Sequence, residues 1–187
     1  SLDLKAAMER KERVVKKNLM GTESLLKKNK VVTIKGQGRL KAKDLIEVTD
    51  SIGATSEVAA KAIVLATGSS VGSLPMAPVD GRVVLSSDDI LSLDQVPDSL
   101  LVIGAGAVGV EFASLYLTFG SKVMLVEKEA RLVPMEDVEI SEALLRSFTR
   151  QGMEVFVGAS IKSVRVEGNL AWTEFEHQGQ IQRVRTE

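Results

Sequence analysis

The chain has 187 residues, of which 44% are hydrophobic, and its formal net charge is −1. That length supports one large core or two small ones, and the balanced charge gives no reason to expect a nucleic-acid partner. We expect neither a membrane span nor a signal peptide, because no apolar run reaches spanning length and the first residues lack the signal pattern. The absence of cysteine excludes a thiol redox centre within this chain.

The first part of the chain predicts one long helix followed by short strands. Residues 2–29 have apolar side chains near helical spacing, with an expected interruption at Gly21 and Thr22. Residues 1–50 carry 13 Lys and Arg against 7 Asp and Glu, which we interpret as a solvated basic helix face. Strands are expected after the helix at 31–34, 39–41, 45–48 and 61–65, the last of them buried.

The second part predicts a βαβαβ unit and an antiparallel meander. Pro75 and Pro78 interrupt regular structure, and Ser87 or Asp88 can begin a short helix that ends at Leu91. We expect residues 99–157 to form a parallel βαβαβ core, with helices at 110–119 and 137–150. Antiparallel strands are expected to follow at 161–166, 171–175 and 180–185. The fold class is therefore α/β and Rossmann-like.

A glycine motif follows the first strand of this core, with the sequence Gly104-Ala105-Gly106-Ala107-Val108-Gly109. In a dinucleotide site Gly104 permits the tight turn, Gly106 lets the backbone approach a pyrophosphate, and Gly109 lets the helix lie close to the strand. The helix N-terminus then offers free N–H groups to the phosphates. A glycine-rich turn between two core strands is the alternative interpretation.

An acid at the end of the next strand favours NAD as the cofactor. Glu127 follows Gly104 by 23 positions, where a carboxylate can accept hydrogen bonds from the adenine ribose and would repel a 2′-phosphate. Lys128 and Arg131 lie close behind and leave NADP as the alternative.

An ordered set of motifs gives the chain a family resemblance. The motifs are Ile-Val-Leu-Ala-Thr-Gly-Ser (63–69), Ser-Ser-Asp (86–88), Val-Pro-Asp-Ser-Leu (96–100), Gly-Ala-Gly-Ala-Val-Gly-Val-Glu (104–111) and the segments 28–38 and 132–141. In this order they resemble the flavin-dependent pyridine nucleotide-disulfide oxidoreductases, and within them the dihydrolipoamide dehydrogenases most. The resemblance covers nearly the whole chain.

The resemblance implies an internal piece of a three-layer FAD/NAD(P)-binding fold. Residues 1–74 would be the C-terminal portion of an FAD-binding domain that packs around the strand at 61–65, residues 75–98 a connecting segment, and residues 99–187 an NAD-binding domain without its closing strand. The family's flavin glycine motif, cysteine pair and catalytic His-Glu pair have no counterpart here. We therefore expect no catalytic residue and no metal ligand, and we give the lone His177 no role beyond that of a surface residue.

The matching motifs also imply cofactor contacts. Thr67, Gly68 and Ser69 match a turn that contacts FAD, and Gly36 matches a backbone contact near the adenine end of the flavin. For NAD, Glu111 matches an acid near the nicotinamide and Ile161 an apolar residue beside the adenine. Without the resemblance, residues 67–69 would be interpreted as an ordinary turn, Glu111 as an acid on the helix surface and Ile161 as a core residue of a strand.

The activity implied is that of a longer parent enzyme. Such an enzyme oxidises dihydrolipoyl groups through a redox disulfide and FAD, and it passes a hydride to NAD⁺. Its partners would be a lipoyl domain of a 2-oxo acid dehydrogenase or glycine cleavage complex and a second copy in a homodimer, in the bacterial cytoplasm or the mitochondrial matrix. This chain alone should be inactive. The alternatives are a piece of another flavin disulfide reductase, of the mercuric or glutathione type, and a stand-alone NAD-binding module.

Overall fold

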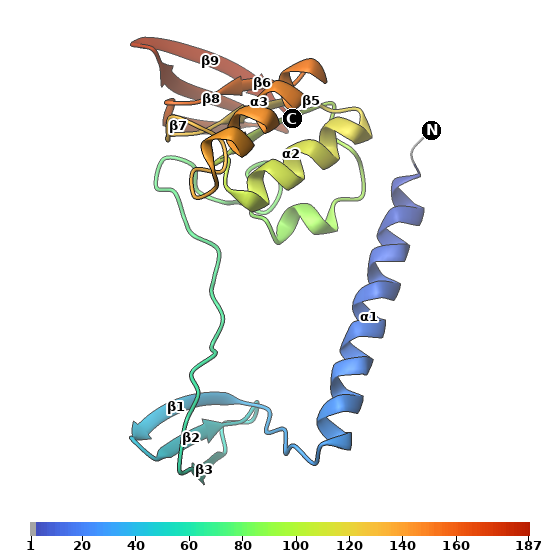
Figure 1. Cartoon of the computed structure of the whole chain (residues 1–187), viewed down its shortest axis with the longest axis vertical. Helices are drawn as coiled ribbons and strands as arrows, with labels where there is room; N and C mark the ends of the chain where they lie inside the picture. The colour runs from blue at the N-terminus through green and yellow to red at the C-terminus, as the bar shows by residue number, and fades with distance from the viewer. Residues whose placement is uncertain (1–2) are drawn as a thin grey trace. The chain divides into compact units, whose positions relative to one another are not determined.

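The computed structural model describes residues 3–187, which divide into two compact units (Figure 1). What we call the first unit is Ala7–Ser70, and the second unit is Val71–Glu187 together with residues 3–6. The first unit holds one three-stranded sheet, and the second holds two. The predicted domain limits of 1–74, 75–98 and 99–187 stay a prediction.

Helix α1 (Leu4–Lys28) runs without interruption, so the break predicted at Gly21 and Thr22 is wrong. A glycine within a helix costs about 1 kcal/mol relative to alanine, which good helix formers on both sides can offset. The Thr22 hydroxyl donates a hydrogen bond to the Asn18 carbonyl at 3.0 Å. This bond lies within the helix, so Thr22 does not stabilise a non-helical backbone at this point. No residue of α1 is buried.

The sheet of the first unit has the order β1-β2-β3, with β1 (Gln37–Ala42), β2 (Leu45–Thr49) and β3 (Thr55–Ala59) antiparallel. The strands predicted at 39–41 and 45–48 are confirmed. The prediction missed β3, whose sequence Thr-Ser-Glu-Val-Ala looks too polar for a strand. Asp50 stabilises the turn between β2 and β3, because its carboxylate accepts hydrogen bonds from the N–H groups of Ile52 and Ala54, each at 2.9 Å.

The strands predicted at 31–34 and 61–65 are absent. The Val64 and Leu65 side chains are 89% and 71% exposed, although the run looked buried from its sequence. An apolar run becomes a strand only where a neighbouring strand accepts its backbone hydrogen bonds. Among the described residues no strand pairs with 61–65. The expectation that residues 1–74 pack around this strand is therefore wrong for this chain.

The second unit begins with an irregular segment that carries one short 3₁₀ helix, η1 (Asp89–Ser92), where a short helix was predicted. The Asp80 carboxylate accepts hydrogen bonds from the N–H groups of Arg82, Val83 and Val84. The Arg82 guanidinium in turn donates to the Gly168 carbonyl at 2.6 Å. These bonds tie the segment to the turn after β7 (Ser160–Glu167).

A parallel sheet forms the middle of the second unit. Its strands β4 (Ser99–Ile103), β5 (Lys122–Val126) and β6 (Glu154–Phe156) lie in that order and all pair in parallel. Helix α2 (Ala107–Phe119) joins the first two strands, and α3 (Val138–Arg150) joins the second and third. The predicted βαβαβ core is confirmed.

An antiparallel meander completes the unit, as predicted. It consists of β7, β8 (Leu170–His177) and β9 (Gln180–Thr186). This sheet and the two helices cover opposite faces of the parallel sheet, because Val126 packs with Phe175 of β8 whereas Val123 and Leu125 pack with Tyr116 of α2 and Phe148 of α3. The unit therefore has three layers, and the fold class is α/β as predicted.

Side chains of strand β5 point alternately to the two faces of the parallel sheet and take part in two hydrophobic clusters, one on each face. Val123 and Leu125 face the helices and join a cluster that contains Tyr116 and Phe148. Val126 faces the opposite way and packs with Phe175 of β8. Because successive side chains of a strand point to opposite faces, a strand that is apolar throughout is buried on both sides.

Candidate dinucleotide-binding site

The glycine motif forms the turn between β4 and α2. Gly104 has a φ of +97°, a conformation that a side chain would strain, and its N–H donates a hydrogen bond to the Val126 carbonyl at 2.8 Å. A Cβ on Gly109 would collide with the carbonyl oxygen of Gly104. The first glycine therefore makes the turn and the third brings the helix against the strand, as the spacing predicts.

Gly106 differs from these two glycines because nothing in the fold requires it. A Cβ on Gly106 would meet no atom within 4 Å, and its φ of −69° suits any residue. Gly106 is also the N-cap of α2, where no side chain provides a capping hydrogen bond. The position is open on the side where a pyrophosphate is predicted to approach.

The N-terminus of α2 has unused donors. Val110 makes the first helical hydrogen bond, from its N–H to the Gly106 carbonyl at 3.1 Å. Within the described chain, no acceptor binds the N–H groups of Gly106, Ala107, Val108 and Gly109. Free N–H groups together with the helix dipole suit an anion.

Glu127 lies beside this loop and is only 8% exposed. One carboxylate oxygen accepts a hydrogen bond from the Ala105 N–H at 2.5 Å, and the other accepts one from the Glu129 N–H at 2.8 Å. These two bonds fix the carboxylate at the end of β5. Each oxygen keeps a further lone pair, so the group can still accept two hydroxyl hydrogens.

The two basic residues after Glu127 differ in their contacts. Lys128 is exposed, whereas the guanidinium of Arg131 donates a hydrogen bond to the Pro134 carbonyl at 2.6 Å. Arg131 is thus engaged by its own loop, four residues past the acid.

A cavity of about 980 Å³ borders the glycine loop. Its wall includes Gly104, Gly106 and Val108 of the loop, the apolar strand β4, and parts of the segment 71–97. Such a volume lies at the upper end of the range found for ligand pockets. Glu127, Glu111 and Ile161 are not among its lining residues. The glycine loop therefore borders the cavity, whereas the Glu127 carboxylate does not.

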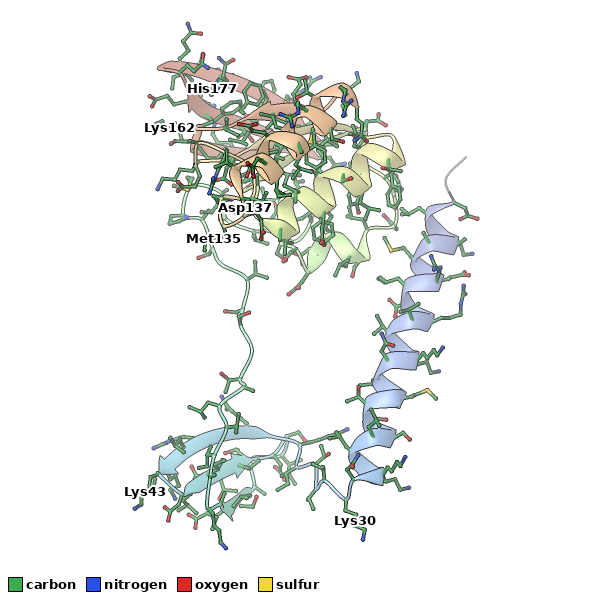
Figure 2. All side chains as sticks on the ribbon, viewed as in Figure 1. Lys30, Lys43, Met135, Asp137, Lys162 and His177 are labelled. Carbon is green, nitrogen blue, oxygen red and sulfur yellow. The ribbon has the colours of Figure 1, made fainter. Side chains whose placement is uncertain are left out.

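The remaining residues predicted to contact NAD lie in different surroundings. Glu111 is exposed and follows the first turn of α2. Ile161 is half-buried and packs against the cluster of Val126 and Phe175, which suits a core residue. His177, which Figure 2 labels, is not a plain surface residue. Its ring packs edge-on against that of Phe156, with the ring centroids 5.4 Å apart.

The residues predicted to contact FAD belong to the first unit. Thr67, Gly68 and Ser69 lie in an exposed segment without regular structure, and Gly68 has a φ of +74°. Gly36 packs against the end of β2, where a Cβ would lie 2.5 Å from the Thr49 carbonyl oxygen. The fold itself therefore requires glycine at position 36.

Sequence reasoning missed two residues that hold the glycine loop. The Val133 N–H donates a hydrogen bond to the Ala105 carbonyl at 2.8 Å, and the Ser141 hydroxyl donates one to the Leu132 carbonyl at 2.7 Å. Ser141 is 3% exposed. A buried serine in an amphipathic helix is a usable signal, because a buried hydroxyl must find a partner. Nothing in the sequence marks Val133.

The family model for pyridine nucleotide-disulphide oxidoreductases matches residues 2–184. The chain belongs to this family. Among curated members, it is 40% identical over 166 residues to a dihydrolipoyl dehydrogenase of Chlorobaculum tepidum, which covers 89% of this chain and 35% of that protein. It is 38% identical over 168 residues to the mitochondrial dihydrolipoyl dehydrogenase of Pisum sativum, covering 90% and 34% respectively.

A solved structure is similar to this chain over its whole length. The crystal structure of LpdA from Mycobacterium tuberculosis superposes with a TM-score of 0.89 at 28% identity, over all of this chain and 41% of that one. This chain thus spans about a third of the length of the curated relatives it matches.

No helix among residues 3–187 is long and apolar enough to cross a membrane. No group of three or more His, Cys, Asp and Glu side chains in that range is placed to hold a metal ion.

Proposed function

We propose that residues 99–187 bind NAD(H), with the pyrophosphate on the glycine loop and the adenine ribose on Glu127. The observation that carries this proposal is the group of free N–H donors at the start of α2, next to a buried carboxylate that is bonded to the same loop. Gly106 leaves the backbone open to the phosphates. In this pose Ala107 and Val108 contribute N–H groups from the first turn.

The preference for NAD over NADP follows from the Glu127 carboxylate. Because two backbone N–H groups hold it in place, it cannot turn away from a 2′-phosphate without losing both hydrogen bonds. Arg131 donates a hydrogen bond to the Pro134 carbonyl, which holds its guanidinium against its own loop. Both features support NAD.

The roles of Glu111 and Ile161 in NAD binding are also proposals. Glu111 lies one turn into α2, on the helix whose free end receives the pyrophosphate, and we assign it to the nicotinamide side. Ile161 belongs to the layer that covers the parallel sheet and is assigned to the adenine side.

For the longer protein we propose the activity of a dihydrolipoyl dehydrogenase, the name that the relatives in Chlorobaculum tepidum and Pisum sativum carry. In such an enzyme FAD carries electrons from a dithiol, and NAD⁺ accepts them as a hydride. Gly36, Thr67, Gly68 and Ser69 would supply backbone contacts to the FAD. The chain holds no cysteine and so cannot form the redox disulfide by itself. We therefore expect it to show no dehydrogenase activity alone.

The proposed partners and location belong to that longer protein as well. They are a lipoyl domain of a 2-oxo acid dehydrogenase or glycine cleavage complex and a second copy of the enzyme in a homodimer. The compartment would be the bacterial cytoplasm or the mitochondrial matrix, and the relatives include a mitochondrial protein.

Calorimetric titration of the 187-residue chain with NADH and with NADPH tests the cofactor proposal. We expect NADH to bind more tightly, and Glu127→Ala to reduce this preference because the repulsion of the 2′-phosphate is lost. Glu129→Ala is the matched control, since Glu129 contributes only its backbone N–H to the Glu127 carboxylate. Equal binding of the two nucleotides by the unmodified chain would contradict the proposal.

A further inference from the structure

Val133 has a backbone conformation that its residue type disfavours. Three described non-glycine residues have a positive φ, and two of them lie at ordinary turn positions: Lys30 after α1, and Gln178 in the hairpin between β8 and β9. Val133, with a φ of +39°, is β-branched, buried and followed by Pro134. β-Branching and a following proline both disfavour this region, so the surroundings must hold Val133 there.

Hydrogen bonds hold the Leu132–Val133 peptide unit at both ends. Its carbonyl accepts a hydrogen bond from the Ser141 hydroxyl at 2.7 Å, and its N–H donates one to the Ala105 carbonyl at 2.8 Å. The Ser141 hydroxyl lies farther from the Asp137 carbonyl, at 3.3 Å, so the Leu132 oxygen is its better acceptor. Helix α3 is thus connected to the glycine loop through one peptide unit.

The next peptide unit in this series is Ala105–Gly106, whose orientation follows from planarity. In a trans peptide the C=O and the following N–H point in opposite directions. Because Val133 holds the Ala105 carbonyl, the Gly106 N–H must point away from Val133, and no described acceptor binds it. Hydrogen bonds in series also polarise one another, which strengthens the last donor.

We infer that Ser141 is a positioning residue for the pyrophosphate of NAD(H), acting through this series of hydrogen bonds, which we call the Ser141 relay. The relay runs from the Ser141 hydroxyl through the Leu132–Val133 and Ala105–Gly106 peptides to the Gly106 N–H. Ser141 does not touch the cofactor. Its effect is to hold and polarise one backbone donor, and the inference rests on the proposed NAD(H) function.

The binding test compares ligands with and without phosphates, using the whole chain. Ser141→Ala should weaken the binding of NADH and of ADP by about threefold to tenfold, the usual effect of one hydrogen bond, and should leave the binding of adenosine unchanged. Ser147→Ala is the matched control, because Ser147 lies on the same helix and its hydroxyl accepts a hydrogen bond from Gln151 outside the relay. Ser141→Thr keeps the hydroxyl and should restore NADH binding.

Nuclear magnetic resonance tests the relay without any ligand, and therefore separately from the proposed function. In the unmodified chain, a scalar coupling should connect the Val133 nitrogen and the Ala105 carbonyl carbon across their hydrogen bond. Ser141→Ala should move the Gly106 amide proton upfield, and Ser147→Ala should not. If NADH and ADP fail to bind the unmodified chain, the NAD(H) proposal fails while these signals still decide on the relay.

Three results would overturn the inference. The first is the absence of the Val133–Ala105 coupling, which requires no variant and so does not depend on how Ser141→Ala folds. The second is an unchanged Gly106 signal in Ser141→Ala. The third is an equal loss of affinity for adenosine and ADP in that variant, which would indicate a general structural role for Ser141.

Discussion

The two units of this chain contrast in how they bury similar sequence patterns. In the first unit, Val48 is the one buried hydrophobic residue among those described, and the apolar run at 61–65 is mostly exposed. In the second unit, a comparable apolar strand, β5, is buried between helices and meander. A local pattern therefore becomes a core element only where other elements cover it.

The largest expected effect concerns the core of the second unit. Phe175 is fully buried between Val126 and Phe156, so Phe175→Ala should destabilise this unit by about 3–5 kcal/mol through loss of burial and formation of a cavity. Val48→Ala should cost about 1–2 kcal/mol, because few buried neighbours surround it. Urea unfolding followed by the fluorescence of Trp172 measures the first effect. An equal loss of unfolding free energy in the two variants would contradict the difference in burial between the two units.

A second prediction concerns local opening in the unmodified protein. Amide hydrogens of β1–β3 should exchange faster than those of β4–β6, because few buried contacts hold the first unit closed. Hydrogen exchange read by mass spectrometry measures this on proteolytic fragments. Uniform protection across both units would show that the first unit has a core of its own.

A third prediction, with the smallest effect, concerns pH and the turn at Asp80. Burial acts to raise the pKa of the Asp80 carboxyl, but the N–H groups of Arg82, Val83 and Val84 and the Arg82 charge together hold that pKa below 3.8. A lowered pKa in the folded state stabilises the protein above the unfolded pKa, and this stability is lost as the pH falls through the folded pKa.

The measurement for Asp80 is the melting temperature between pH 2 and pH 6. The unmodified chain should lose stability below about pH 4, and Asp80→Asn should lose less over the same interval because it has no proton to bind. Asp88→Asn is a matched control, since no described side-chain bond of Asp88 supports this turn. Identical pH profiles for Asp80→Asn and the unmodified chain would contradict the assignment.

Much of the second unit could be predicted because its signals are local. The buried strands, the glycine turn and the meander follow from hydrophobic periodicity and from Gly104 and Gly109, whose conformation or packing excludes a side chain. The run at 61–65 was predicted wrongly for the opposite reason, since pairing depends on strands elsewhere. β3 was missed because its pairing with β2 outweighs its polar composition.

In the candidate site, too, some features could be predicted from the sequence and others could not. The positions of Gly106 and Glu127 follow from motif spacing, whereas the contact of Val133 with the loop depends on a backbone conformation that no residue pattern encodes. The hydrogen bonds from the N–H groups of Ala105 and Glu129 to the Glu127 carboxylate could not be predicted either, because they form only in the folded loop.

A single titration tests the proposed site most directly, namely NADH binding to Gly106→Ala. This position has room for a Cβ and an ordinary φ, so the variant should stay folded. Its loss of stability should be no more than about 1 kcal/mol, because alanine is a poorer N-cap than glycine. The added methyl group would occupy the place of the pyrophosphate, and NADH affinity should fall by about tenfold or more. Gly109→Ala should instead lose stability, because its Cβ collides with the Gly104 carbonyl. Unchanged NADH affinity in Gly106→Ala would contradict a pyrophosphate on this loop.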